Sequence, residues 1–308
     1  MAEIRRAIAM GFFDGFHIGH AALIEKTKQR ALELECEPSV LSFDVHPDNV
    51  IFNIKVPLIS DCPGRKEIAK RCFDIDSVIF IHFNRHVMQM AWQEFADTII
   101  SEMGAVWFVV GHDFTFGSRG EGTAEKLKEY CGEKGIGCDI IPPVTLDGRI
   151  VSSTYIRTLI EDGNMEEAAR YLGHRHCLSD TVHSGYHIGR KLEAPTINMY
   201  FPENVIVPKH GVYATKVILP DGTEYPSVTN IGIRPTVSDE NIVSVESHLL
   251  NFSGNLYGTP ARVDFYHFIR PEQKFASFEE LSAVIKQDAA AAEKYFSEKQ
   301  DNSITYNG

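Results

Sequence analysis

The first half of the sequence alternates short apolar runs with stretches that have the apolar spacing of a helix. The apolar runs have strand length and are rich in Val, Ile and Phe. They cover residues 7–10, 39–43, 77–83, 105–111 and 137–144, and the helical stretches cover 21–35, 64–73, 92–104, 122–135, 154–163 and 165–173. Such alternation predicts βαβ units, and therefore a doubly wound parallel sheet with helices on both faces.

The pattern changes after about residue 178. Segments of alternating polar and apolar residues now follow one another, separated by turns such as PDG at 220–222. These segments cover residues 210–219, 224–233, 241–250 and 260–269. Their spacing predicts antiparallel strands that form a small β-barrel.

A helix over residues 277–296 is expected to end the fold. Ser277 and Glu280, three residues apart at its start, predict a capping box. A length of 308 residues also favours two domains. The expected division is 1–176 for the parallel-sheet domain, 177–298 for the barrel domain and 299–308 for a polar tail.

The composition narrows the classes of partner. A net charge of −12 argues against wholesale binding to nucleic acid or an anionic membrane, although anionic small ligands remain possible. No apolar stretch is long enough to span a bilayer, and the N-terminus is a poor secretory signal. The six cysteines contain no CxxC spacing, which is typical of reduced thiols. We expect a cytoplasmic protein, and the sequence does not indicate its oligomeric state.

The stretch GFFDGFHIGH, residues 11–20, lies between the first apolar run and the first helical stretch. A glycine-rich turn lets backbone N–H groups approach a ligand, and a helix start favours anions. His17 and His20 are three residues apart, so both can donate hydrogen bonds or positive charge to one phosphate. This arrangement predicts phosphoryl or nucleotidyl transfer. The alternative is that both are ordinary surface or cap residues, or a stray metal pair.

Two further turns follow apolar runs. One is VGHDFTFGSRGEG at 110–122, and the other is VSSTYIR at 151–157, where two hydroxyls and an arginine stand at a helix start. Three such turns at strand ends predict a ligand crevice at the carboxyl edge of the parallel sheet. The GxGxxG fingerprint is absent, so a nicotinamide cofactor is not expected.

The stretches GFFDGFHIGH, FDVHP (43–47), GHDFTFG (111–117) and SSTYIR (152–157) occur in this order. Together they resemble the adenylyltransferase module of prokaryotic bifunctional riboflavin kinase/FAD synthetases, within the nucleotidyltransferase superfamily marked by HxGH. The resemblance implies that His17 and His20 contact the ATP phosphates and stabilise the transition state. It also implies ATP contacts from Gly11, Phe12, Phe13, Asp14, Gly15, Ser153, Thr154 and Arg157, and flavin contacts from Asp113, Phe114 and Phe116. The family usually has Asn where this chain has Phe12.

The second half carries its own polar residues. Thr196 and Asn198, in GRKLEAPTINM (189–199), are two residues apart on one face of an extended segment, where they can ligate Mg²⁺ beside nucleotide phosphates. Glu246, in VESHLLNF (245–252), is a carboxylate able to take a proton from a hydroxyl nucleophile. The alternatives are a hydrogen bond that stabilises a turn for Thr196 and Asn198, and a cross-strand ion pair for Glu246.

With NIGIRPT (230–236), LYG (256–258) and FIRPEQKF (268–275), these motifs resemble a riboflavin kinase domain. The resemblance implies ATP contacts from Gly189 and Pro195 and a flavin contact from Arg270. One departure concerns Glu193 and Ala194, where the family generally has a glycine followed by an aromatic residue. Glu193 adds bulk and negative charge where the ATP phosphates are expected.

The two resemblances imply a bifunctional enzyme. It would phosphorylate riboflavin to FMN with Mg²⁺ and ATP, then join FMN to the AMP of a second ATP, releasing pyrophosphate and giving FAD. Riboflavin, FMN and ATP would be its partners, with no nucleic acid and no membrane. Two alternatives stay open: a FAD synthetase whose kinase half is impaired, and a flavin-binding regulator that has lost both activities.

Overall fold

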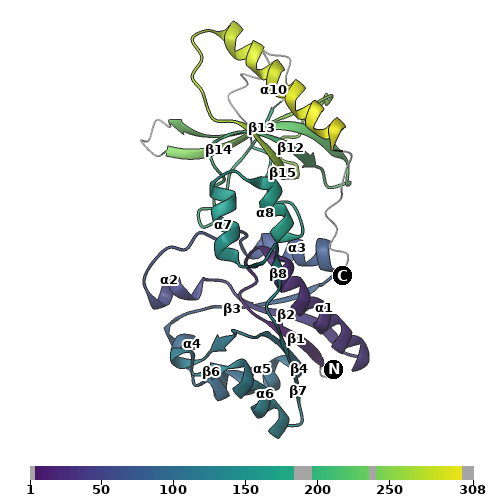
Figure 1. Cartoon of the computed structure of the whole chain (residues 1–308), viewed down its shortest axis with the longest axis vertical. Coiled ribbons are helices and arrows are strands. Elements are labelled where there is room, and N and C mark those ends of the chain that lie inside the picture. The colour runs from purple at the N-terminus through teal and green to yellow at the C-terminus, as the bar shows by residue number, and fades with distance from the viewer. Residues whose placement is uncertain (1–3, 184–195, 236–240, 300–308) are drawn as a thin grey trace. The chain divides into compact units, whose positions relative to one another are not determined.

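The computed structural model describes residues 4–183, 196–235 and 241–299 (Figure 1). The chain divides into two compact units, Met1–Ser153 and Thr154–Thr305. The division lies at the start of helix α7 (Ser153–Glu161), which is earlier along the chain than the boundary expected after residue 176. Each unit is described by itself.

The first unit is built on a five-stranded parallel sheet with the strand order β3-β2-β1-β4-β7. The strands are β1 (Arg6–Met10), β2 (Glu37–Phe43), β3 (Ser77–Ile81), β4 (Ala105–Gly111) and β7 (Gly137–Ile141). The chain runs outward from β1 to β3, then returns to the other side of β1 at β4. The order therefore reverses between β1 and β4, and such a switch point opens a crevice at the carboxyl ends of the strands.

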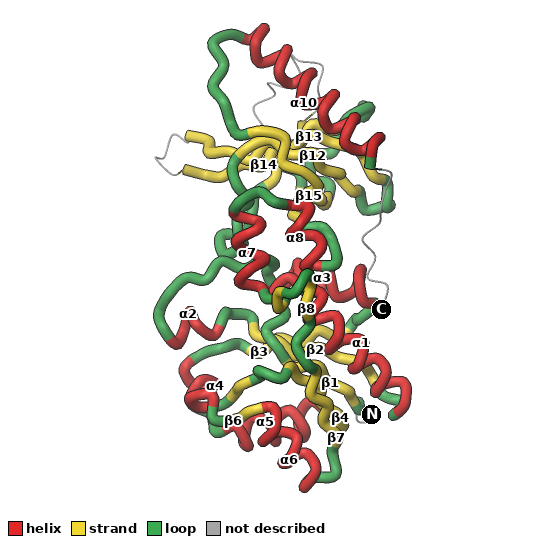
Figure 2. The backbone as a smooth tube through the Cα atoms, viewed as in Figure 1, coloured by secondary structure: helices red, strands yellow, loops and turns green. Residues whose placement is uncertain are grey.

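Helices cover both faces of this sheet (Figure 2). The longer ones are α1 (Ile18–Glu33), α3 (Cys62–Phe73), α5 (Trp92–Met103) and α6 (Ala124–Glu133). Side chains of β1 alternate between two cores: Ile8 and Met10 pack in the core that contains residues of α5 and α6, and Ala9 packs in the core with α1 and α3. The predicted doubly wound sheet is confirmed.

The short elements of this unit were not predicted. They are the helices α2 (Pro47–Ile51) and α4 (Arg85–Gln89), the 3-10 turns η1 (Asp14–Phe16) and η2 (Ser118–Gly120), and the hairpins β5–β6 (Thr115–Phe116, Gly122–Thr123) and β8–β9 (Thr145–Leu146, Arg149–Ile150). Most lie in the segments that follow β-strands, where the sequence shows turn residues rather than a periodic pattern.

The second unit contains a six-stranded sheet with the order β10-β15-β12-β13-β14-β11, in which neighbouring strands are antiparallel. The strands are β10 (Cys177–Thr181), β11 (Thr196–Met199), β12 (Gly211–Ile218), β13 (Glu224–Pro235), β14 (Asn241–Leu249) and β15 (Pro260–Arg270). The two edges meet, because His183, just after β10, forms an antiparallel bridge with Asn198 of β11. The predicted barrel is confirmed.

Among its described residues, the second unit also contains the helices α7, α8 (Met165–Leu172) and α10 (Phe278–Glu298). Ser277 caps α10 as expected, because its hydroxyl accepts from the Glu280 N–H at 3.2 Å. The return bond of the box differs from the expected one: the Glu280 carboxylate accepts from the N–H of Ala276 at 2.8 Å. None of the helices in the described ranges is both long and apolar enough to cross a membrane.

Candidate active sites

A pocket of about 390 Å³ lies at the carboxyl edge of the parallel sheet. The ends of four strands contribute Met10, Phe43, Gly111 and Ile141 to its wall. The turn after β1 adds Gly11 and Phe12, and the start of α1 adds both histidines of the HxGH motif. The pocket therefore lies beside the switch point between β1 and β4, as the three turns in the sequence predicted.

His17 and His20 face each other at the start of α1. Their rings stack with centroids 3.6 Å apart and an interplanar angle of 12°. His17 is also the N-cap residue of α1, since its Nδ1 accepts from the backbone N–H of His20 at 3.2 Å. A neutral His17 with Nδ1 engaged in this way carries its proton on Nε2, where it can be donated to a ligand. The cap role and a ligand-binding role are therefore compatible.

The surroundings of His20 decide between the two possibilities that the sequence left open, hydrogen bonds or positive charge. Burial, the neighbouring His17 and the Arg65 guanidinium hold the pKa of His20 well below its usual range. The ring is therefore neutral near pH 7 and offers hydrogen bonds rather than positive charge. Its Nδ1 is buried without a hydrogen-bond partner among the described residues. Buried polar atoms are usually hydrogen-bonded, so a bound ligand would supply the missing partner.

The glycine-rich turn divides into a pocket part and a core part. Gly11 and Phe12 line the pocket. Phe13 is fully buried, and the buried Asp14 carboxylate accepts from the backbone N–H groups of Ile59 at 2.8 Å and Ser60 at 3.1 Å. Gly15 is buried at φ 76°, and its N–H donates to the Ser60 hydroxyl at 3.1 Å. The side chains of residues 13 and 14 therefore hold the turn in place, and the contacts with ATP expected of them stay predictions.

The hydroxyl motif after β9 begins with Ser153 in the pocket wall. The Ser153 hydroxyl donates to the carbonyl of Asp14 at 3.0 Å, which joins the start of α7 to the glycine-rich turn. Thr154 and Arg157 follow on α7, beyond the division between the units. Their contacts with ATP stay predictions.

The expected flavin residues lie after β4. Asp113 and Phe114 line the pocket. Phe116 does not: it is 7% exposed and packs in the core against Phe95 and Trp92, with ring centroids 5.9 and 6.1 Å away. Phe116 also stacks on Phe114 at 5.3 Å, so it supports a pocket residue from behind. Its expected contact with the flavin stays a prediction.

Several pocket residues had no signal that we read in the sequence. Gly19 leaves room for the His17 ring, because a Cβ there would lie 3.1 Å from it. The segment between β7 and the VSSTYIR stretch adds Pro142, Pro143, Val144 and Ile150 to the wall, and Val151 and Ser152 of that stretch follow them. No periodic pattern marks that segment.

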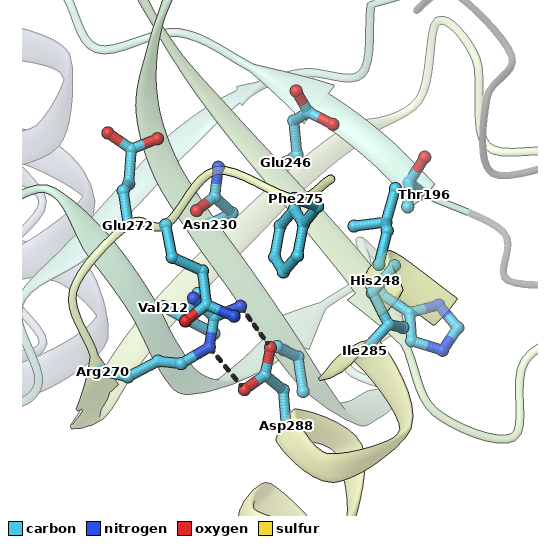
Figure 3. A pocket seen from close by; sticks show the side chains of 13 residues that line it. Thr196, Val212, Asn230, Glu246, His248, Arg270, Glu272, Phe275, Ile285 and Asp288 are labelled. Carbon is cyan, nitrogen blue, oxygen red and sulfur yellow. Dashed lines mark hydrogen bonds and ion pairs between the residues drawn. The ribbon is translucent and has the colours of Figure 1, made fainter. Parts of the chain in front are cut away.

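A second pocket, of about 290 Å³, lies between the barrel and α10 (Figure 3). The strand register places Asn198, Glu246 and Asn230 directly opposite one another on β11, β14 and β13. The next row of the same face holds Thr196, His248 and Val228. Opposite residues of neighbouring strands share a face of the sheet. The register therefore brings Thr196, Asn198 and Glu246 together, although about fifty residues separate the two motifs.

Arg270 lines this pocket, but its guanidinium is engaged by a neighbour. Nε and Nη2 donate to the two carboxylate oxygens of the buried Asp288 on α10, at 2.9 and 2.8 Å (Figure 3). Nη1 donates to the carbonyl of Pro271 at 3.0 Å. The geometry makes Arg270 an anchor for α10 and the segment after β15, and a direct flavin contact stays a prediction.

Other lining residues of the second pocket were not predicted. They are Val212, Val228, Asn230, His248, Glu272, Gln273, Phe275, Leu281, Ile285 and Asp288. Two expected ATP residues, Gly189 and Pro195, and the unusual pair Glu193 and Ala194 lie outside the described residues.

Comparisons with known proteins match both units. A family model described as FAD synthetase matches residues 2–155, and one described as riboflavin kinase matches residues 172–296. The relatives named bifunctional riboflavin kinase/FMN adenylyltransferase include one from Listeria monocytogenes serovar 1/2a, 32% identical over 97% of this chain and 95% of the relative. The one from Pseudomonas fluorescens is 34% identical over 94% of this chain and 93% of its own.

A solved structure is also similar over most of the chain. Its title describes a macrolide-efflux protein from Streptococcus pneumoniae, and it is 28% identical with a TM-score of 0.82, covering 94% of each chain. The segments matched by the two family models contain the residues that line the two pockets described above. The similarity to the curated relatives extends over nearly the full sequence. The chain therefore belongs to the family of bifunctional riboflavin kinase/FMN adenylyltransferases.

Proposed function

We propose that the chain phosphorylates riboflavin to FMN with Mg²⁺ and ATP, and adenylylates FMN to FAD with a second ATP, releasing pyrophosphate. The observation that carries this proposal is the presence of two separate pockets, one in each matched segment. His17, His20 and Ser153 line the first pocket, and Thr196 and Glu246 line the second. We assign adenylyl transfer to residues 1–176 and the kinase step to residues 177–298.

In the kinase step, Glu246 takes the proton of the ribityl 5′-hydroxyl as the oxygen attacks the γ-phosphate of ATP. The bond between the γ-phosphorus and the bridging oxygen breaks, and ADP leaves. Glu246 is supported in this role by its place on the pocket wall, opposite both Asn198 and Asn230. The apolar side of the pocket, with Phe275, Leu281 and Ile285, suits a flavin ring.

Magnesium enters with ATP, and Thr196 and Asn198 are its proposed protein ligands. Both offer a neutral oxygen, from adjacent positions on one face of β11. The described residues contain no group of three or more His, Cys, Asp or Glu that could hold a metal ion. A donor set of a few protein oxygens fits Mg²⁺, which usually keeps several waters and binds substrate phosphates.

In the adenylyl step, the FMN phosphate attacks the α-phosphorus of ATP and pyrophosphate leaves. The nucleophile belongs to the substrate, so the protein supplies position and hydrogen bonds. His17 and His20 donate to the triphosphate as charge builds on its oxygens, and the Gly11 turn approaches it with its backbone. Ser153, Thr154 and Arg157 are proposed to hold the phosphates, and Asp113 and Phe114 to line the flavin side.

The test incubates purified protein with riboflavin, Mg²⁺ and ATP and separates the flavins by chromatography. Accumulation of FAD through FMN supports both activities. FAD formed only from supplied FMN would leave the synthetase alone, with an impaired kinase half. No product from either flavin would instead favour a binding protein without activity.

A further inference from the structure

A buried arginine side chain lies behind the wall of the pocket in the first unit. Arg65, on α3, has no exposed surface and is among the largest fully buried side chains of the described residues. Its Nη1 donates to the carbonyl of Phe12 at 2.9 Å, to the hydroxyl of Ser42 at 2.7 Å and to the carbonyl of Phe43 at 2.9 Å. Neither the sequence motifs nor the family resemblance pointed to this residue.

These acceptors belong to the pocket wall. Phe12 and Phe43 both line the pocket, Phe12 in the turn after β1 and Phe43 at the end of β2. The Ser42 hydroxyl also donates to the Phe12 carbonyl at 2.6 Å. One buried guanidinium therefore ties together two strand ends that form adjacent parts of the wall.

The charge of Arg65 has no direct counter-ion. Within the described ranges, no carboxylate lies within 4.0 Å of its nitrogens; its Nη2 donates to the Cys62 sulfur at 3.4 Å and its Nε has no hydrogen-bond partner. The guanidinium lies over the rings of Phe12, at 4.8 Å, and Phe80, at 4.7 Å. Burying an unpaired charge is unfavourable, and an apolar side chain of similar size would avoid that penalty.

We propose that Arg65 is a positioning residue for adenylyl transfer. It ties the Phe12 turn, which follows β1, to the end of β2, and it places a positive charge behind the pocket wall at the carboxyl edge of the sheet. The inference rests on the function proposed above. It explains why the fold keeps a buried cation here without an ion pair: Asp14 and Asp61 act on Arg65 only from a longer distance, and the anionic substrates, ATP and FMN, bring further negative charge to the pocket. A displaced turn would misalign both histidines, since the same turn leads into α1.

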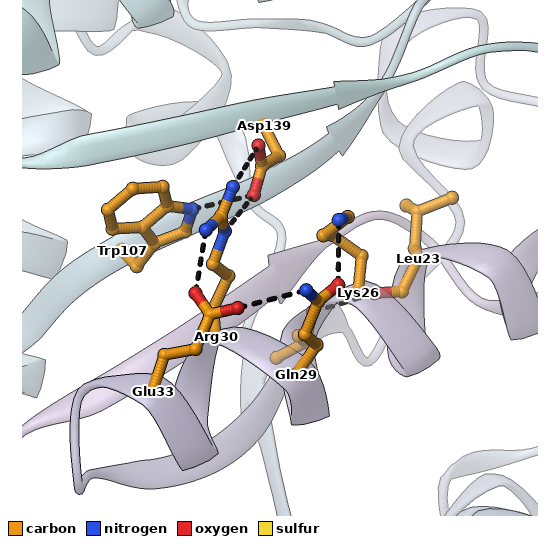
Figure 4. Close-up of polar contacts among 8 residues, drawn as sticks. Leu23, Lys26, Gln29, Arg30, Glu33, Trp107 and Asp139 are labelled. Carbon is orange, nitrogen blue, oxygen red and sulfur yellow. Dashed lines mark hydrogen bonds and ion pairs between the residues drawn. The ribbon is translucent and has the colours of Figure 1, made fainter.

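The test compares Arg65→Met, which removes the charge, with Arg65→Lys, which keeps it but cannot donate to several acceptors from a planar fork. Arg30→Met is the matched control. Arg30 also stacks on an aromatic ring, Trp107 at 4.4 Å, and pairs with Asp139 at 2.7 Å (Figure 4). It is not among the residues that line the pocket. Each protein is assayed for FAD formation from FMN and for FMN formation from riboflavin, and its thermal midpoint is measured.

We expect Arg65→Met to lower kcat for FAD formation by about 100-fold and Arg65→Lys by about 10-fold. FMN formation, in the other unit, stays within about two-fold in all variants, and Arg30→Met leaves both activities near wild type. A folded Arg65→Met protein with wild-type FAD formation overturns the proposal. If that variant does not fold, an unchanged kcat in Arg65→Lys overturns it. A wild-type protein that makes no FAD would instead count against the proposed function.

The pH dependence of FAD formation distinguishes an electrostatic role of Arg65 from a merely structural one. The charged or titratable groups around His20 are His17 and Arg65, and His112 and Asp113 line the same pocket. Removing the Arg65 charge raises the pKa of His20, so the acid limb of FAD formation moves to higher pH in Arg65→Met. The limb stays in place in Arg65→Lys and Arg30→Met. An unmoved limb in Arg65→Met would refute the electrostatic part of the proposal.

Discussion

His176 should make the second unit sensitive to acid. The ring is 2% exposed, packs beside both Phe201 and Phe265, and has no hydrogen-bond partner for Nε2 among the described residues. Burial, and to a lesser degree His174, lower the pKa of His176 from 6.5 to about 3. The folded state therefore holds a neutral ring at every pH above about 3, whereas the unfolded chain takes up a proton below 6.5.

The sign and size follow from linkage. Between these two values the unfolded state binds the extra proton, so the free energy of unfolding falls as pH falls. The stability is fully present above the unfolded value of 6.5 and is lost progressively down to about 3. At pH 5, one and a half units below the unfolded value, His176 should cost about 2 kcal/mol of stability relative to pH 8.

The assay is urea unfolding at pH 8 and pH 5. Unfolding of the second unit is monitored by hydrogen exchange in peptides from β12 and β15. Both tryptophans, Trp92 and Trp107, lie in the first unit, so their fluorescence would not report on this one. His176→Phe removes the titration while keeping an aromatic ring beside Phe201, and should abolish the loss of about 2 kcal/mol. His210→Gln, a partly exposed control, should keep it. The same pH dependence in wild type and His176→Phe would refute the reasoning.

Three further outcomes are expected. His20→Ala should lower FAD formation about 100-fold and leave FMN formation intact, measured by flavin chromatography, because a preorganised donor is lost; equal loss of both activities in a folded protein would contradict separate sites. Glu246→Gln should lower FMN formation by roughly 100- to 10,000-fold and spare FAD formation from added FMN; an unimpaired kinase would exclude a general-base role. Asp288→Asn should raise the KM for riboflavin and destabilise the second unit by on the order of 2 kcal/mol; an unchanged KM and unfolding midpoint would show that the pair with Arg270 does not shape the pocket.

The architecture was predictable because local patterns determine it. The strands of the first unit are buried on both faces, so they read as apolar runs, and their helices show the spacing of one buried face. The histidines at the start of α1 and the carboxyl edge of the sheet follow from the same patterns. Short elements of the first unit were missed: α2 and α4 have five residues each, which leaves too few positions for a helical pattern.

Residues with long-range partners could not be assigned from the sequence. Asp14 was expected at the ATP, but its carboxylate accepts hydrogen bonds from Ile59 and Ser60, forty-five and forty-six positions later. Phe116 was expected at the flavin, but the path of the β5–β6 hairpin turns it into the core. A motif identifies which residues occur near a site, and only the packing decides which side chains face the ligand.

Strand register imposes the same limit on the second pocket. Asn230 shares a row with Glu246 because β13 and β14 pair at that register, and a slip of one residue would move one of them to the opposite face of the sheet. The sequence shows alternation in both strands but does not say which residues are opposite. His248 and Thr196 are brought together in the same way. The kinase pocket is therefore a consequence of pairing across the barrel, whereas the HxGH site is largely set within one turn and one helix, and that difference explains why the sequence predicted more of the first site than of the second.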